Sequence, residues 1–148
     1  MPYSPLGRGL LTATLTRQDI DRSDFRRGDP RFQGTDLDQN LARVAALRRI
    51  ADGLGLTPAQ LALAWLLAQG PDVVPIPGTR RLDRIEQNAA AAGVELTEDD
   101  LRSLDEAVPR TGWAGDRRSF AAVGTSRRTG PVPGQACGGT ARPRQRGK

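Results

Sequence analysis

Apolar residues recur with a helical period through much of the chain. Between residues 41 and 53, apolar side chains such as Val44 and Leu47 fall near one face and arginines lie mostly on the other. This period predicts an amphipathic helix, and we expect Gly55 to end it together with the preceding glycine. The polar stretch 14–39 has no such period, so we expect a long loop there.

Three more helices follow from capping signals. Thr57 can cap a helix, Pro58 suits its first position and Gln60 can complete the cap, ahead of a long apolar run. We expect further helices over 82–92 and from the acidic stretch after Thr97 to about residue 107. The three adjacent carboxylates at 98–100 indicate either a solvated cap or a metal site, and helical spacing favours the cap because it turns them to different sides.

One short apolar run has the composition of a strand. Val73, Val74 and Ile76 are β-branched and are bounded by Gly-Pro before and Pro-Gly after. Such a run is typical of a strand that is covered on both faces.

The residues after this run suit an anionic ligand. Gly78 allows close backbone approach, Thr79 can cap the next helix, and that helix's free N–H groups would face an anion. On such a helix Arg80 and Arg84 are one turn apart, so two guanidinium groups can converge on one phosphate. The alternative is a solvated, basic helix start in an arginine-rich chain.

A second motif, PYSPLGRGLLT from residue 2, places an aromatic and a hydroxyl before a Gly-x-Gly loop. Together with IPGTRRLDRIEQN it resembles the aldo/keto reductase family over about residues 2–116. The resemblance implies the α/β class, as a C-terminal fragment of a (β/α)₈ barrel. This fragment would hold the last two strands and their helices, and would be mostly helical as it stands.

The same resemblance implies NADP as the cofactor. Tyr3 matches the residue that stacks on the nicotinamide ring. The loop along the pyrophosphate is matched by Ser4, Leu6, Gly7 and Gly9. Positions around the 2′-phosphate are matched by Gly78, Thr79, Arg80 and Arg84, and the adenine contacts by Gln87 and Asn88. Two residues depart from the family pattern: Gln87 replaces the usual Glu, and Ala13 the usual Gly.

The family's catalytic residues have no counterparts here. The resemblance implies a Tyr acid supported by Lys, Asp and His, but the chain has no His, its one Tyr is Tyr3, and its one Lys is Lys148. Tyr3 already matches the stacking position, and Lys148 lies outside the resemblance. We therefore expect no catalytic residue in this chain. A complete barrel needs about 250 residues, so the expected part is less than half of one.

Charge divides the chain in two. The net charge is +5, but residues 117–148 hold eight basic residues and no acidic one, which leaves residues 1–116 at −3. This basic tail is rich in Gly, Pro and Arg, so we expect it to be disordered. Two interpretations of this tail stay open: it is a non-specific polyanion-binding arm, or it is the product of a shifted reading frame.

The remaining signals are weak. Cys137 is the only cysteine, so an intrachain disulfide is excluded and a reducing compartment is expected. Without an apolar run of membrane-spanning length or a signal peptide, we expect a cytoplasmic protein that binds no membrane. We expect no metal ligand set.

Two functions are therefore predicted. The first is an NADP-dependent reductase that transfers hydride between the nicotinamide and a small carbonyl or alcohol, reduced here to its cofactor-binding part, residues 1–116. The second is a non-enzymatic remnant, or a weak nucleotide-binding module without turnover.

Overall fold

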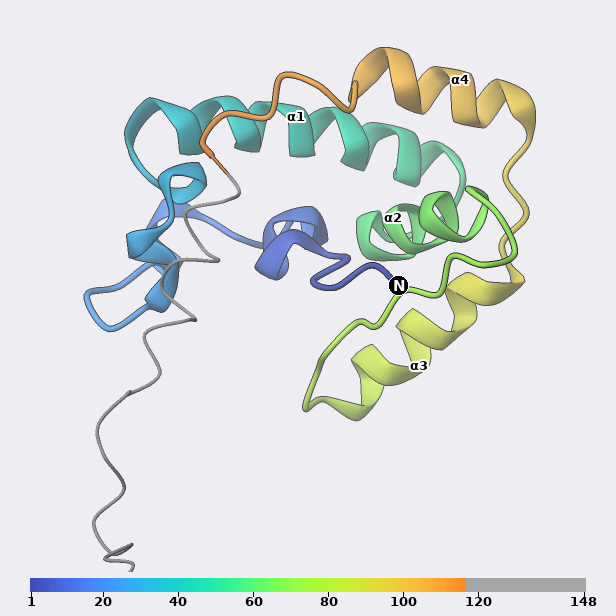
Figure 1. Ribbon diagram of the computed structural model, residues 1–148, viewed down its shortest axis with the longest axis horizontal. Coiled ribbons are helices and arrows are strands. Elements are labelled where there is room, and N and C mark those ends of the chain that lie inside the picture. The colour runs from blue at the N-terminus through green and yellow to red at the C-terminus, as the bar shows by residue number, and fades with distance from the viewer. Residues whose placement is uncertain (117–148) are drawn as a thin grey trace, which may run out of the picture.

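A computed structural model describes residues 1–116 of the chain (Figure 1). This part is mostly helical, and no strand occurs within it. It contains four α-helices and five 3₁₀ helices. Their bounds, in chain order, are η1 Gly7–Thr12, η2 Arg17–Asp19, η3 Phe25–Gly28, η4 Pro30–Phe32, α1 Gly34–Gly53, α2 Pro58–Leu67, α3 Leu82–Ala90, η5 Ala91–Gly93 and α4 Glu98–Ala107.

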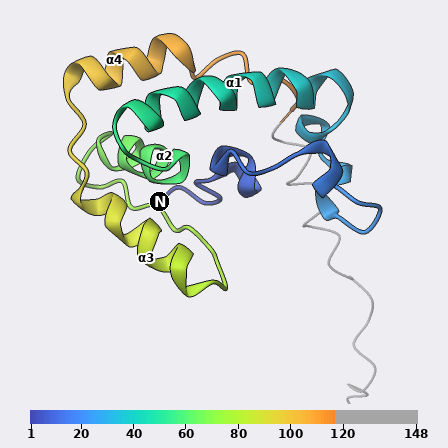
Figure 2. The same cartoon turned by 180° about the vertical axis from the view of Figure 1, so that it is seen from behind.

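Helix α1 is the central element. In Figures 1 and 2, α4 lies along one side of α1, while α2 and η1 lie on the other side and α3 lies beyond α2. Leu37 and Val44 of α1 lie in one apolar cluster with Leu10 and Phe32. Leu47 and Ala51, nearer the C-terminus of α1, belong to a second apolar cluster with Leu61 and Leu104.

The predicted caps at the starts of α2 and α4 are confirmed. At α2 the Thr57 hydroxyl accepts the backbone N–H of Gln60, and the Gln60 side chain accepts the N–H of Thr57. Thr97 and Asp100 form the same reciprocal pair at the start of α4. Gly55 follows α1 in the left-handed region at φ 69°, where a side chain would be strained. These local signals explain why the predicted starts of α2 and α4 and the predicted end of α1 are close to those observed.

The expected loop over 14–39 is partly wrong. Helix α1 begins at Gly34 rather than residue 41, and three 3₁₀ turns precede it. Aspartates build these turns: the carboxylates of Asp24 and Asp29 accept the backbone N–H groups of Arg26 and Arg31. A carboxylate that pairs with its own neighbouring backbone stabilises a turn without any apolar period.

The expected strand at 73–76 is not formed. Residues 73–76 have no regular secondary structure, and within residues 1–116 no segment pairs with them as a strand. Val74 is 56% and Ile76 48% exposed, and Val73 is only half-buried, so the run is not covered on both faces as predicted. A strand requires a neighbouring strand for its backbone hydrogen bonds, and the described part supplies none.

Two further expectations concern the chain as a whole. The predicted disordered tail, 117–148, lies outside the described residues, as does Cys137. In the described part no single helix is long and apolar enough to cross a membrane; only α1 and α2 taken together, across an 86° bend, reach the required length and composition.

Candidate functional site

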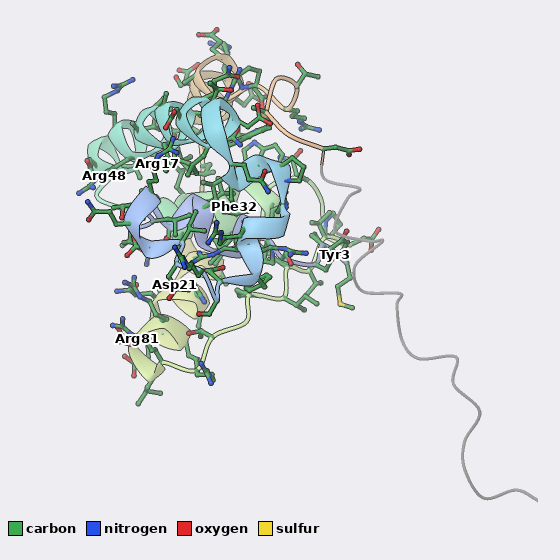
Figure 3. The ribbon with its side chains drawn as sticks, turned by 90° about the vertical axis from the view of Figure 1, so that its left-hand side faces the viewer. Tyr3, Arg17, Asp21, Phe32, Arg48 and Arg81 are labelled. Carbon is green, nitrogen blue, oxygen red and sulfur yellow. The ribbon has the colours of Figure 1, made fainter. Side chains whose placement is uncertain are left out.

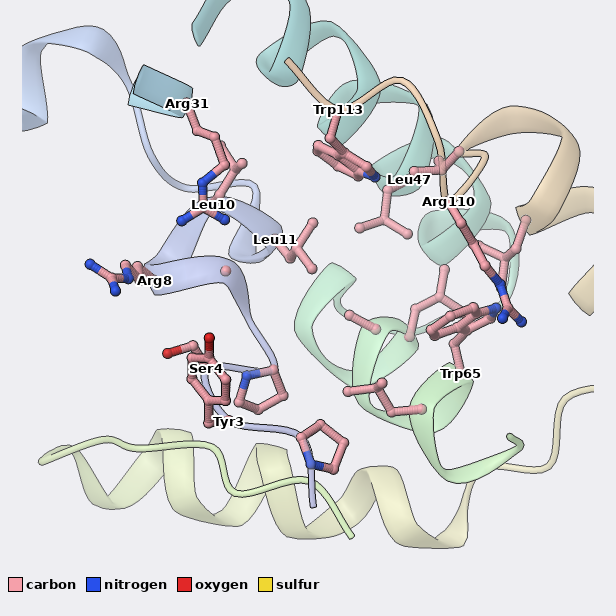
Figure 4. Close-up of a pocket in the computed structure, with 18 of the residues that line it drawn as sticks. Tyr3, Ser4, Arg8, Leu10, Leu11, Arg31, Leu47, Trp65, Arg110 and Trp113 are labelled. Atoms are coloured by element: carbon pink, nitrogen blue, oxygen red, sulfur yellow. The ribbon is translucent and has the colours of Figure 1, made fainter. Parts of the chain in front are cut away.

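A cavity of about 600 Å³ opens in the described part. It is bordered by the N-terminal segment, α1, α2, α4 and the segment that follows α4. Figure 4 shows Tyr3 and Ser4 on one side of this cavity and Trp113 on the other, with Leu11 and Leu47 between them. Its lining is mostly apolar and includes Arg8, Arg31 and Arg110.

The cavity gathers part of the predicted N-terminal set. Tyr3, Ser4 and Gly7 line it, whereas Leu6 and Gly9 are not among its lining residues. The backbone turns sharply here, with positive φ angles of 50° at Ser4, 56° at Gly7 and 90° at Gly9. Tyr3 is 62% exposed, so its ring is accessible to a planar ligand.

An arginine that the resemblance did not assign holds this loop. The Arg26 guanidinium donates through Nη1 to the backbone carbonyl of Arg8, at 3.2 Å. Arg8 itself has a positive φ of 60°, a strained conformation for a residue with a side chain. Asp24 fixes Arg26 through a 2.6 Å ion pair, and the hydrogen bond from Arg26 lowers the pKa of the Asp24 carboxyl. The sequence signal was the pair Asp24 and Arg26 two residues apart.

The second predicted set lies around the start of α3, and two expectations about it are wrong. Thr79 does not cap the helix; its hydroxyl accepts the N–H of Arg81, 3.2 Å away, and Arg81 occupies the cap position without a side-chain cap. Arg80 precedes the helix, so it is not one helical turn from Arg84. Both differences arise because α3 begins only at Leu82.

Arg80, Arg81 and Arg84 differ in the side chains that neighbour their guanidinium groups. Arg81 forms a 2.6 Å ion pair with Asp83, and its hydrogen bond lowers the pKa of that carboxyl. Arg84 instead donates to the Gln87 side-chain oxygen at 2.8 Å, and its nearest contact with Asp83 is 4.0 Å. Within residues 1–116, Arg80 forms no ion pair within 4.0 Å. Arg80 and Arg84 therefore have weaker contacts with acidic side chains than Arg81 has.

A smaller cavity of about 330 Å³ lies beside these residues, between α2 and α3. Thr79 and Asn88 line it, together with apolar side chains such as Val74 and Ile85. Gly78 lies in the irregular segment before Thr79, and a Cβ added to it would meet nothing within 4 Å. The backbone at Gly78 is therefore open to a ligand.

The two sets do not share one cavity. In Figure 3, Tyr3 and Arg81 lie on opposite sides of the described body, and none of the predicted residues around α3 lines the larger cavity. A single ligand that contacts both sets must therefore be extended.

No metal site is apparent in the described part, where no three His, Cys, Asp or Glu side chains converge. Of the acidic residues that open α4, Asp100 serves as the capping partner of Thr97, and Asp99 pairs with Arg102 at 2.9 Å.

Comparison with known proteins identifies the family. The sequence profile of the Aldo/keto reductase family matches residues 1–109, so the chain belongs to that family. It is 44% identical over 117 residues to probable aldo-keto reductase 1 of Glycine max, and the aligned region covers 79% of this chain and 34% of that relative. It is 43% identical over 116 residues to aldo-keto reductase yakc of Schizosaccharomyces pombe, whose name specifies NADP(+). Here the aligned region covers 78% of this chain and 34% of the relative.

A solved structure agrees with this result. The glycerol dehydrogenase of Gluconobacter oxydans superposes with a TM-score of 0.65 at 29% identity, covering 73% of this chain and 33% of that one. The chain spans about a third of the length of the curated relatives it matches.

Proposed function

We propose that residues 1–116 are the last two β/α units of an aldo/keto reductase barrel and bind NADP(H) through two separate surfaces. Tyr3, with the loop formed by Ser4, Leu6, Gly7 and Gly9, would contact the nicotinamide and pyrophosphate end. The surface around α3 would hold the adenosine 2′-phosphate end. The separation of the two surfaces suits a dinucleotide, which is an extended ligand.

The contact between Arg84 and Gln87 carries this proposal. In this contact the Gln87 oxygen orients the Arg84 guanidinium and adds no negative charge beside it. No side chain caps the N-terminus of α3, so the backbone N–H groups of Leu82 and Asp83 are also available to an anion. Arg80, Arg84 and these N–H groups fit a phosphate, and Thr79 and Asn88 lie close enough in sequence and space to border the attached nucleoside.

In the reductase reading, the cofactor supplies the hydride when it is bound, and the residues of this chain bind and orient it. The second reading is binding without turnover, and composition favours it for this polypeptide. General acid catalysis requires a positioned proton donor of suitable pKa. The chain has no His, and its one Tyr is assigned to stacking.

Titration calorimetry of the full chain with NADPH and NADH tests the proposal. Arg84→Ala should weaken NADPH and leave NADH almost unchanged, since only NADPH carries the 2′-phosphate. The loss of charge-assisted hydrogen bonds costs about 1.5–3 kcal/mol, or roughly ten- to a hundredfold in affinity. Partial exposure of Arg84 places the effect near the lower end.

Arg81→Ala is the matched control, because Asp83 already occupies that guanidinium. Its NADPH affinity should stay near that of the parent chain. Equal losses for NADPH and NADH in Arg84→Ala, or a larger loss in Arg81→Ala, would show that Arg84 does not recognise the phosphate.

A further inference from the structure

The segment that follows α4, residues 110–115, forms one wall of the larger cavity. We call this segment the strap. In Figures 1 and 2 it runs back from α4 along α1 toward the start of that helix. Arg110, Gly112, Trp113 and Gly115 all line the cavity, and Trp113 packs against the apolar cluster of Leu10, Phe32, Leu37 and Val44.

A fully buried amide fastens the strap. Asn40, on α1, is 0% exposed. Its Nδ2 donates to the carbonyl oxygens of Arg31 and Ala114, each at 3.0 Å, and its Oδ1 accepts the N–H of Ala114 at 2.9 Å. An amide side chain has two N–H donors and one acceptor oxygen, so every group of Asn40 is used. The partners come from two segments, one of them 74 residues away.

The strap packs closely against the Arg31 backbone at its Gly115 end. A Cβ at Gly115 would lie 2.5 Å from the backbone nitrogen of Arg31, and Gly115 has a φ of +83°. At the other end the Arg110 guanidinium donates to Gln69 at 2.6 Å and lies 4.9 Å from the centre of the Trp65 ring. The exposed contact at Arg110 is weak compared with the buried amide, so Asn40 provides the main attachment.

We infer that Asn40 is a positioning residue whose side chain closes the strap over the larger cavity and thereby limits access to it. The inference does not depend on the cofactor. It rests on the buried amide, the two main-chain segments that the amide joins, and the close seat at Gly115. Without the Asn40 donors, the carbonyls of Arg31 and Ala114 lose their partner, and Trp113 is the only large apolar residue of the strap that remains packed.

Tryptophan quenching in the full chain tests this inference. Trp65→Phe leaves Trp113 as the sole tryptophan. In that background, Asn40→Asp removes both donors and places a carboxylate against two carbonyl oxygens. Acrylamide quenching of Trp113 should rise toward its value in the urea-unfolded chain, while far-UV circular dichroism keeps the helical signal. Gln39→Glu makes the same chemical change at an exposed neighbour on α1 and should leave quenching unchanged.

A second variant acts from the strap side. Gly115→Ala should expose Trp113 in the same way, because its Cβ would collide with the Arg31 backbone, whereas Gly93→Ala has open space around it and should have no effect. Trp113 that stays protected in Asn40→Asp or in Gly115→Ala would overturn the inference. The inference would also be overturned if Asn40→Asp lost the helical signal at the same time as Trp113 became exposed to quencher. Asn40 would then stabilise the fold as a whole rather than the strap.

Discussion

Burial, rather than distance, should decide how much each ion pair of this protein contributes to stability. The pair Arg31–Asp29 and the pair Arg17–Asp38 have the same separation, 2.6 Å between nitrogen and oxygen. Their surroundings differ: the side chains are 14% and 0% exposed in the first pair, and 57% and 61% in the second. Replacing each aspartate by alanine therefore compares a buried ion pair with an exposed one of the same length.

The structure sets the expected magnitudes. Asp29→Ala leaves the Arg31 guanidinium without its carboxylate and also removes the acceptor of the Arg31 backbone N–H. Removing one partner of a buried pair costs about 3–5 kcal/mol. Arg31 borders the larger cavity and can reach water there, so we expect about 3 kcal/mol. Asp38→Ala should cost about 0–1 kcal/mol, as exposed pairs do.

Urea unfolding at neutral pH, followed by circular dichroism, measures both changes. A domain of ordinary stability has about 5–15 kcal/mol in total, so Asp29→Ala should lower the midpoint strongly. Adding Arg31→Met to Asp29→Ala should recover part of the loss, because the uncompensated charge is then gone. Similar costs for Asp29→Ala and Asp38→Ala, or no recovery in the double variant, would refute the argument from burial.

Two further predictions concern α2 and α4. Leu61→Ala should destabilise the chain by about 2–5 kcal/mol in urea unfolding, because Leu61 is fully buried. Leu82→Ala is the control and should have little effect, because Leu82 is 70% exposed. Equal effects of the two variants would contradict the assignment of the core. Hydrogen bonds from Thr97 lower the pKa of Asp100 below its usual 3.8, so this carboxylate stabilises α4 fully above that pH. The contribution should be lost as pH falls through the lowered pKa, and Asp100→Asn should remove this part of the acid-induced loss; a variant with an unchanged acid transition would argue against it.

The sequence predicted the elements whose signals are local. The start of α2 and the start of α4 depend on Thr57 and Thr97 with their partners three residues later, and the end of α1 depends on Gly55. Capping hydroxyls and a left-handed glycine act within one turn, so they are visible in the sequence. These predictions needed no information about the rest of the fold.

Predictions that required a distant partner were less successful. The run at Val73, Val74 and Ile76 has the composition of a strand, but strand formation depends on a neighbour, and the described residues contain none. The α3 residues were expected to present two arginines on one helix face, but the late start of α3 at Leu82 leaves Arg80 outside it. The roles of the predicted cofactor residues stay predictions until binding is measured.

The late predicted start of α1 has a specific cause in Asn40. The buried positions of α1 follow one another by three or four residues, as a helix face requires, and Asn40 occupies one of them. A pattern that treats every asparagine as polar is interrupted there, so the predicted helix began only after it. Asn40 is nevertheless buried, because main-chain groups of η4 and of the strap satisfy its amide. Buried polar residues of this kind break the apolar period at the same positions where they join distant segments of the chain. They are therefore hard to recognise from sequence, and Asn40 is the residue through which α1, η4 and the strap are held together.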